Sequence, residues 1–254
     1  MNINLKINAI ERISSEGEHC AFTDLIENPF DNSGKSLLNC YRRAVNHISP
    51  DGVVIVCKVN TDSRAKTYQR LALPSWDLRD PKFCFDGRKL IITAYAKHKD
   101  ANTGAVTTKM VSYFSTTGES WSTPHFFGHS GWWLWRVTWN KGKAYGFAYN
   151  RNSQRIDLYE GSPLKQPYLQ KKGAISLEKH KFGYPNESHI LFDDADNATA
   201  IVRRDADSFS AQLGFSSPPY TNWKWHDLKK YVGGPVMLSL TENSYLVAGR
   251  NWDG

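Results

Sequence analysis

The feature that most constrains the fold of this chain is an internal repeat of about 50 residues. Five apolar stretches each begin with a short opening element, and these elements are Phe22-Thr23-Asp24, Arg79-Asp80-Pro81, Trp135-Arg136-Val137, Asn186-Glu187-Ser188 and Gly234-Pro235-Val236. The intervals from Asp24 to Asp80, Arg136, Glu187 and Pro235 are 56, 56, 51 and 48 residues. Short strands repeated at this period predict a radial β array, because each unit is a small sheet that cannot bury its faces alone. Opening strands then meet around one axis, where distant Asp, Glu and Arg side chains converge.

Length and composition agree with a single all-β domain over residues 1–254. A chain of this length can bury one sizeable core without a second domain. Aromatic residues make up 13% of the sequence, and 18 Gly and 11 Pro interrupt it. Amphipathic helical patterns are almost absent, which favours many short strands joined by turns.

Each unit also contains a second apolar strand that follows a turn. These strands are expected at residues 37–41, 90–95, 144–149, 198–202 and 245–249. Turn residues such as Asp86-Gly87 and Asn140-Lys141-Gly142 precede two of them and suit tight hairpins. Third and fourth strands complete a four-stranded antiparallel blade.

A weaker repeat lies in the connections between the third and fourth strands. Residues 114–121 (FSTTGESW) resemble the Asp-box motif S-x-D-x-G-x-T-W, with Phe114 and Thr116 replacing its Ser and Asp, and residues 61–68 and 216–223 are weaker copies. The fifth unit supplies only two strands, so we expect a propeller of about four and a half to five blades that is incomplete at the C-terminus. Residues 5–13 are expected to add an outer strand. Open strand edges would favour a homo-oligomer that covers them.

Several segments together resemble bacterial sialidase-like proteins, the six-bladed β-propellers of the exo-α-sialidase or neuraminidase superfamily. The resemblance runs from about residue 18 to the end, without the sixth blade, and rests on residues 21–26 (AFTDLI), 41–42 (YR), 47–52 (HISPDG), 77–82 (DLRDPK), 133–139 (WLWRVTW), 202–205 (VRRD) and 217–225 (SPPYTNWKW). Sialidases hold a sugar carboxylate with three arginines, and they attack with a tyrosine that a glutamate activates. The resemblance implies an arginine cluster of Arg42, Arg203 (or Arg204) and Arg250, with Glu187 as the activating base. The tyrosine would belong to the blade that this sequence lacks.

A second resemblance competes with the first. The segment Leu78-Arg79-Asp80-Pro81 is similar to the R-D-P element of five-bladed glycosidases that act on arabinans, xylans or fructans. That reading implies three carboxylates, Asp24, Asp80 and Glu187, as base or nucleophile, acid modulator and general acid. Two carboxylates that flank a glycosidic bond are the minimum for hydrolysis.

Each candidate residue also has a structural alternative. A buried carboxylate is costly unless it is paired, so Asp80 would form a salt bridge with Arg79 or cap a turn, and Asp24 carries the same ambiguity. Glu187 would be satisfied by backbone amides. Arg136 would line the site or stack on Trp135 and Trp139. His47 would either bind substrate or occupy a turn. Trp132, Trp133 and Trp135 would either form a platform on which a sugar stacks or pack in the core.

The net charge and the motifs in the sequence limit the kinds of partner and cofactor that we expect. The net charge of +7 favours an anionic partner weakly, but the basic residues are scattered and no nucleic-acid-binding module is present. No phosphate loop, zinc pattern or calcium loop appears, so no cofactor and no metal are expected. The four cysteines lie singly in apolar segments and are expected to be free thiols. The N-terminus does not resemble a signal peptide and no stretch is apolar enough to span a membrane, so we expect a cytoplasmic location, or a secreted or periplasmic one if a leader has been removed.

These observations leave two classes of function open. The first is a sialidase-like hydrolase, or a related propeller, whose central pocket binds an acidic or neutral sugar. The second is an inactive propeller that binds carbohydrate or protein.

Overall fold

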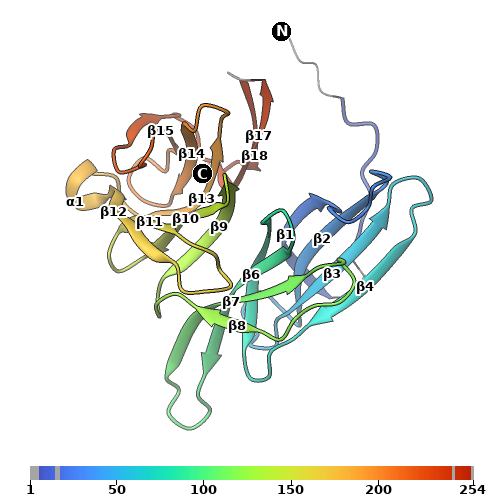
Figure 1. Cartoon of the computed structure of the whole chain (residues 1–254). Helices are drawn as coiled ribbons and strands as arrows, with labels where there is room; N and C mark the ends of the chain where they lie inside the picture. The colour runs from blue at the N-terminus through green and yellow to red at the C-terminus, as the bar shows by residue number, and fades with distance from the viewer. Residues whose placement is uncertain (1–5, 15–17, 242–243, 253–254) are drawn as a thin grey trace.

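The computed structural model describes residues 6–14, 18–241 and 244–252. It contains four four-stranded antiparallel sheets, which are the blades of a β-propeller, and one two-stranded sheet (Figure 1). Blades 1 and 2 comprise β1 (His19–Glu27), β2 (Ser36–Ala44), β3 (Val53–Asn60), β4 (Lys66–Leu71), β5 (Asp77–Phe85), β6 (Leu90–Lys99), β7 (Val106–Ser115) and β8 (His125–Phe127). Blade 3 comprises β9 (Trp133–Asn140), β10 (Lys143–Asn150), β11 (Arg155–Glu160) and β12 (Tyr168–Ser176), followed by the helix α1 (Leu177–His180). Blade 4 comprises β13 (Pro185–Phe192), β14 (Ala198–Arg204), β15 (Gln212–Ser216) and β16 (Lys224–Asp227), and β17 (Gly233–Thr241) and β18 (Ser244–Arg250) form the two-stranded sheet.

The five innermost strands are those that the repeat predicted. β1, β5, β9, β13 and β17 contact one another in that order around the axis. All five second strands, β2, β6, β10, β14 and β18, overlap the ranges expected from the sequence. The prediction of an all-β propeller with four-stranded antiparallel blades is therefore confirmed for four blades. The sialidase-like form with six blades and the description of the propeller as incomplete are not confirmed.

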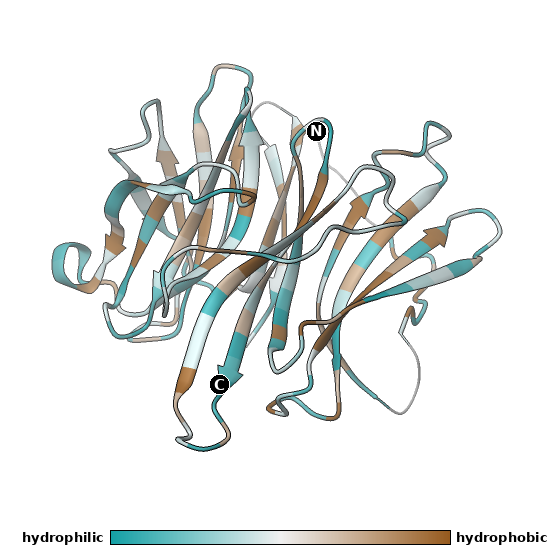
Figure 2. Ribbon diagram, turned by 60° about the horizontal axis from the view of Figure 1, so that its bottom comes forward, coloured by the Kyte–Doolittle hydropathy of each residue, from teal (hydrophilic) through white to brown (hydrophobic). Residues whose placement is uncertain are grey.

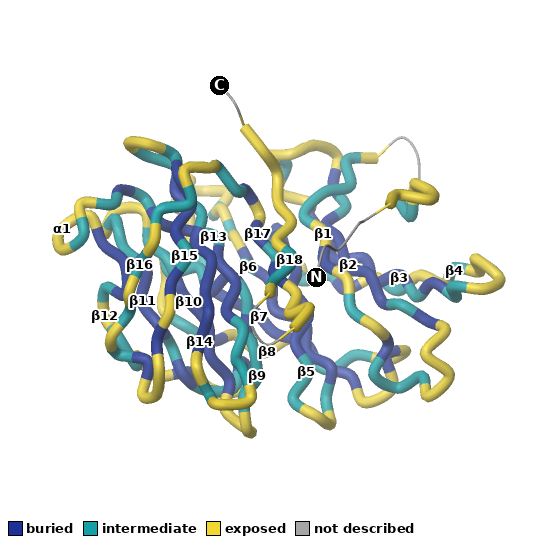
Figure 3. The backbone as a smooth tube through the Cα atoms, turned by 90° about the horizontal axis from the view of Figure 1, so that it is seen from above, coloured by how far each residue is buried: buried dark blue, intermediate teal, exposed yellow. Residues whose placement is uncertain are grey.

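The hydrophobic core lies mainly between adjacent blades. One cluster joins blades 1 and 2 through residues such as Val54 and Ile92, and a second joins blades 3 and 4 through Phe147 and Ala200. A third cluster joins blades 2 and 3. Middle strands are buried where a neighbouring blade covers them, and on the other face of blade 1 a fourth cluster packs against Ile13, Cys20 and Ala72. Loops and β18 are mostly exposed (Figure 3). The hydropathy colouring follows the same division, with apolar residues concentrated on strands (Figure 2).

The weaker repeat has the expected position but not the expected chemistry. Residues 61–68, 114–121 and 216–223 all lie at the connection between the third and fourth strands of their blades. In the second of these, the hydroxyl of Ser115 accepts hydrogen bonds from the backbone N–H groups of Thr117 and Gly118. Trp121 packs against the core and donates to Gln69 at 2.7 Å. An Asp-box of the sialidase type is not confirmed.

The N-terminal segment does not form the outer strand that we expected. Residues 6–13 have no strand pairing, and Leu5 lies outside the described residues. Instead, the segment runs along β4, where Tyr68 and Lys66 donate hydrogen bonds to the carbonyls of Ile13 and Arg12. Side-chain donors hold this segment, so it does not add to the backbone ladder of the sheet. All four cysteines are unpaired.

Candidate functional site

Every innermost strand carries a β-bulge at its opening element. Two residues of the inner strand oppose one residue of the second strand at Phe22-Thr23, Asp80-Pro81, Trp135-Arg136, Asn186-Glu187 and Gly234-Pro235. A bulge bends its strand and turns side chains away from their regular alternation, which is why bulges recur beside active sites. The sequence repeat therefore marks five places where side chains are redirected around the axis.

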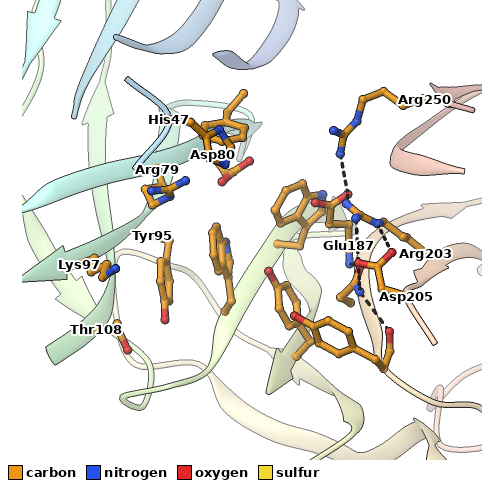
Figure 4. Close-up of a pocket in the computed structure, with 16 residues that line it drawn as sticks. His47, Arg79, Asp80, Tyr95, Lys97, Thr108, Glu187, Arg203, Asp205 and Arg250 are labelled. Atoms are coloured by element: carbon orange, nitrogen blue, oxygen red, sulfur yellow. Dashed lines mark hydrogen bonds and ion pairs between the residues drawn. The ribbon is translucent and has the colours of Figure 1, made fainter. Parts of the chain in front are cut away.

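A cavity of about 510 Å³ lies at these bulges. The first bulge residue of each of the four blades lines it, namely Phe22, Asp80, Trp135 and Asn186. The other lining residues are His47, Arg79, Tyr95, Lys97, Thr108, Trp133, Tyr149, Tyr184, Glu187, Arg203, Asp205 and Arg250. Blades 2 and 4 thus face each other across the cavity with their charged groups (Figure 4).

Asp80 enters the cavity from a left-handed backbone conformation, with φ of 47°. Only 7% of the residue is exposed, and the structure gives its carboxylate no hydrogen bond or ion pair among the described residues. Burial, with a further contribution from Glu187, raises the pKa of Asp80 to about 6, against the opposing effect of Lys82. The expected salt bridge to Arg79 does not form, because Arg79 pairs with Asp77 at 3.2 Å.

Glu187 enters from blade 4 as one member of an ion-paired network. Its Oε2 atom accepts from Arg203 Nη1 and from the backbone N–H of Gly234, both at 2.6 Å. Arg203 also pairs with Asp205 at 2.8 Å, and Arg250 lies 3.9 Å from Glu187 Oε2. The carboxylate of Glu187 is therefore fixed in position, with its Oε1 atom free of hydrogen bonds to the described residues.

Aromatic rings form the wall between these two carboxylates. Trp133 stacks on Tyr95 with ring centroids 3.9 Å apart and an interplanar angle of 2°, and on Tyr149 at 5.6 Å and 16°. Tyr184 continues the wall edge-on at 6.4 Å from Tyr149. The two faces of Trp133 are therefore covered by Tyr95 and Tyr149, and the stacked rings line the cavity as an apolar wall against which a sugar can pack. The sequence suggested Trp133 and Trp135 as a platform, and both line the cavity, whereas Trp132 lies elsewhere, under the Arg155 side chain.

Five of the eight candidate residues line the cavity: Asp80, Glu187, Arg203, Arg250 and His47. His47 lies close to Arg79 in a surface loop, and burial with that neighbouring charge lowers its pKa. The cavity also contains Lys97, Asp205, Tyr95 and Tyr149, which the sequence analysis did not select as site residues. Their signal was their position, since each lies in the second half of a second strand, or directly after it, where the inner partner strand carries a bulge.

Asp24 and Arg136 do not line the cavity but pair with each other near the axis. Arg136 donates to both carboxylate oxygens of Asp24, at 2.6 and 3.1 Å. The backbone N–H of Phe83 donates to the same carboxylate at 2.8 Å. Their position ties blades 1, 2 and 3 together.

Arg42 is also remote from the cavity and is completely buried. Its guanidinium donates to Asp77 at 2.9 Å and to the carbonyls of Asn46 and Ser49. Arg204 of blade 4 occupies the equivalent register position. It is also buried, and it forms an ion pair with Asp207. Arg42 therefore anchors the loop that carries His47 and does not reach the cavity itself.

No family model and no curated protein sequence matches this chain. Solved structures do match it. A protein of unknown function from Dyadobacter fermentans DSM 18053 has a TM-score of 0.76 at 16% identity, covering 92% of this chain and 75% of the other. Zg3597, a family 117 glycoside hydrolase from the marine bacterium Zobellia galactanivorans, has a TM-score of 0.63 at 10% identity, covering 88% and 74%. An N-acetylgalactosamine deacetylase from F. plautii has a TM-score of 0.52 at 9% identity, covering 84% and 72%.

Glycoside hydrolase propellers are among the structural neighbours of this chain. At these identities the likeness establishes the shared fold alone. No group of three or more His, Cys, Asp or Glu side chains in the described parts of the chain is arranged to hold a metal ion. No helix among the described residues is long and apolar enough to cross a membrane.

Proposed function

We propose that this protein is a glycoside hydrolase that binds a sugar residue in the cavity between blades 2 and 4. The observation that carries the proposal is the pair of carboxylates, Asp80 and Glu187, which enter one aromatic-lined cavity from facing blades. Hydrolysis of a glycosidic bond needs one carboxyl group that donates a proton and one carboxylate that attacks or activates water. The surroundings of Asp80 and Glu187 differ, so one carboxyl group can act as the acid and the other as the base or nucleophile.

Asp80 suits the role of general acid. Its raised pKa of about 6 keeps a substantial protonated fraction in mildly acidic solution, and no neighbouring hydrogen bond within the described structure holds its proton. A catalytic acid works best when its pKa lies near the operating pH. The proton would pass from the carboxyl group of Asp80 to the oxygen of the leaving group.

Glu187 suits the role of base or nucleophile. Arg203 and the N–H of Gly234 both bind its Oε2 atom, so the carboxylate is oriented while Oε1 accepts no hydrogen bond from the described residues. If Oε1 attacks the anomeric carbon, the reaction retains configuration, and if it activates water, the reaction inverts configuration. The spacing of the two carboxylates around the bound sugar decides between these outcomes.

A tyrosine nucleophile of the sialidase type fits the cavity less well. Tyr149 lies near both carboxylates, and burial together with neighbouring Tyr184 and Glu187 raises its pKa well above the usual value. A nucleophilic phenolate would need the opposite shift. We therefore assign the chemistry to Asp80 and Glu187.

The test is a panel of aryl glycosides that differ in sugar and anomeric configuration, a fluorogenic sialoside included. We expect wild-type protein to release aglycone from at least one of them, and Glu187→Gln to abolish that release. Glu119→Gln is the matched control, because Glu119 is exposed and, among the described residues, forms an ion pair with Lys58 alone. Proton NMR of the first product would then identify its anomer. Release that Glu187→Gln leaves unchanged would contradict the assignment.

Sugar binding without hydrolysis is a second candidate. The observation that favours it is the ion pair between Glu187 and Arg203, since a neutralised carboxylate is a weaker nucleophile. This alternative predicts that wild-type protein binds sugars in calorimetry while no member of the panel is hydrolysed.

A further inference from the structure

The charges in the cavity are separated into two sides. On the blade 4 side, Glu187 and Asp205 neutralise Arg203, with Arg250 nearby. On the blade 2 side lie Arg79 and Lys97, beside Tyr95 and Thr108 (Figure 4). The two sides differ in how completely their positive charges are paired.

One buried carboxylate, that of Asp77, forms the ion pairs on the blade 2 side. Its Oδ1 atom accepts from Arg42 at 2.9 Å, and its Oδ2 atom accepts from Arg79 at 3.2 Å. Asp77 is 2% exposed and Arg42 is fully buried, so solvent screens neither of them well. The carboxylate of Asp77 is thus shared between two guanidinium groups, whereas Arg203 on the other side has two carboxylates to itself.

Lys97 adds a third positive charge to this side. It is the direct cross-strand partner of Asp77 on β6, yet both oxygens of Asp77 are already bound by arginines. The structure gives Lys97 no hydrogen bond or ion pair within the described part of the chain, and its side chain lines the cavity rim. Asp80 is the remaining carboxylate on this side, and it makes no ion pair either.

We propose that the sugar in this cavity carries an anionic group, a carboxylate or a sulfate ester, and that Lys97 and Arg79 receive it. This inference rests on the proposed function for its sugar, but binding tests it independently of hydrolysis. An anion at this point would pair with Lys97 and with the donors of Arg79 that Asp77 leaves free, and a planar guanidinium can bind an oxyanion through two donors. The stacked rings of Tyr95 and Trp133 lie next to this position and would hold the sugar ring beside it.

The experiment is isothermal titration calorimetry with matched pairs of sugars: glucose with glucuronate, galactose with galacturonate, and galactose with galactose 6-sulfate. We expect at least one charged sugar to bind about tenfold or more tightly than its neutral partner. The preference should shrink between 0.05 and 0.5 M salt, because this rim is open to solvent. A preference confined to uronates, or to the sulfated sugar, would identify which of the two anionic groups is bound.

Lys97→Met tests the assigned residue. We expect it to reduce the preference for the charged sugar by about fivefold or more while the affinity for the neutral partner is unchanged. The matched control is Lys109→Met on the adjoining strand, because Lys109 is exposed, lies over the Phe126 ring at 5.5 Å and does not line the cavity. Equal binding of neutral and charged sugars, no binding of any charged sugar, or a preference that Lys97→Met leaves intact would each overturn the inference. Hydrolysis of a neutral aryl glycoside under the same conditions would still leave the proposed function standing.

Discussion

Arg136 of blade 3 holds Asp24 of blade 1 through two hydrogen bonds of 2.6 and 3.1 Å, across 112 residues of sequence. Asp24 is 7% exposed and also accepts the N–H of Phe83 in blade 2. This contact joins three blades beneath the cavity. Two residues that the sequence suggested for chemistry therefore stabilise the ring of inner strands.

Asp24→Asn should destabilise the fold strongly. The substitution leaves the guanidinium of Arg136 buried without its charged partner, and breaking such a pair costs about 3 to 5 kcal/mol of unfolding free energy. Chemical denaturation measures this loss. Asp62→Asn, at an exposed pair with Lys35, should change the unfolding free energy by about 0.5 kcal/mol or less. Similar values for the two variants would contradict a structural role for Asp24.

Gly52→Ala should disturb the loop that carries His47. A Cβ atom at residue 52 would collide with the Nε atom of Arg42 and with the carboxylate of Asp77. Because both groups are buried and paired, neither can move without breaking its hydrogen bonds, and we expect a loss of about 1 to 3 kcal/mol in unfolding free energy. We also expect weaker sugar binding, since Asp77 positions Arg79. An unchanged melting temperature would show that the loop has more room than this packing indicates.

The blades could be predicted from the repeat, because each repeat unit of about 50 residues forms one small sheet. It did not separate cavity residues from structural ones. Asp24 and Asp80 are 56 residues apart and look equivalent, but the register equivalent of Asp80 is Phe22, the first residue of its bulge. Asp24 lies two residues beyond Phe22 on β1, so its carboxylate pairs with Arg136 and does not line the cavity.

The arginines show the same limit. Arg42 and Arg203 each follow directly on the second strand expected from the sequence, yet the equivalent of Arg42 is Arg204, while Arg203 lies opposite the bulge and lines the cavity. Neighbouring strand residues face opposite sides of a sheet, so a shift of one position exchanges a buried anchor for a cavity residue. Spacing alone does not reveal where a bulge adds the extra residue.

The stability of the protein should depend on the ionisation of Asp80. The pKa of its carboxyl group is raised from 3.8 to about 6 by burial, so the folded protein binds this proton more tightly than the unfolded chain does. The resulting stabilisation is complete below about pH 4 and is lost as the pH rises through about 6. Between pH 4 and pH 7, the unfolding free energy of Asp80→Asn should therefore rise relative to wild type by about 2 kcal/mol. A difference that is constant with pH would contradict the raised pKa.

Hydrolysis should depend on the same group in its protonated form. If Asp80 donates the proton, kcat/KM falls as the pH rises through about 6, and this limb should be absent from the residual activity of Asp80→Asn. A substrate with a good leaving group, such as a dinitrophenyl glycoside, needs less help from the acid. The variant should therefore lose much less activity on that substrate than on a methylumbelliferyl glycoside.

Trp133→Ala should weaken sugar binding more than it affects turnover. Trp133 stacks between Tyr95 and Tyr149, and its removal opens the aromatic wall while both carboxylates stay in place. We expect KM to rise about tenfold, corresponding to the roughly 1 to 1.5 kcal/mol of a lost aromatic contact, with a smaller change in kcat. A fall in kcat with unchanged KM would show that Trp133 acts on the transition state instead.

The central claim is that Asp80 and Glu187 act together on one glycosidic bond. Its most direct test is the rate of aglycone release by Asp80→Asn, Glu187→Gln and the double variant, on the aryl glycoside that wild-type protein hydrolyses fastest. We predict that Glu187→Gln alone lowers kcat by a factor of about 10³ or more, and that the double variant is little slower than Glu187→Gln, as for residues that work as a unit. Full activity of Glu187→Gln, with its fold and sugar affinity intact, would contradict the account.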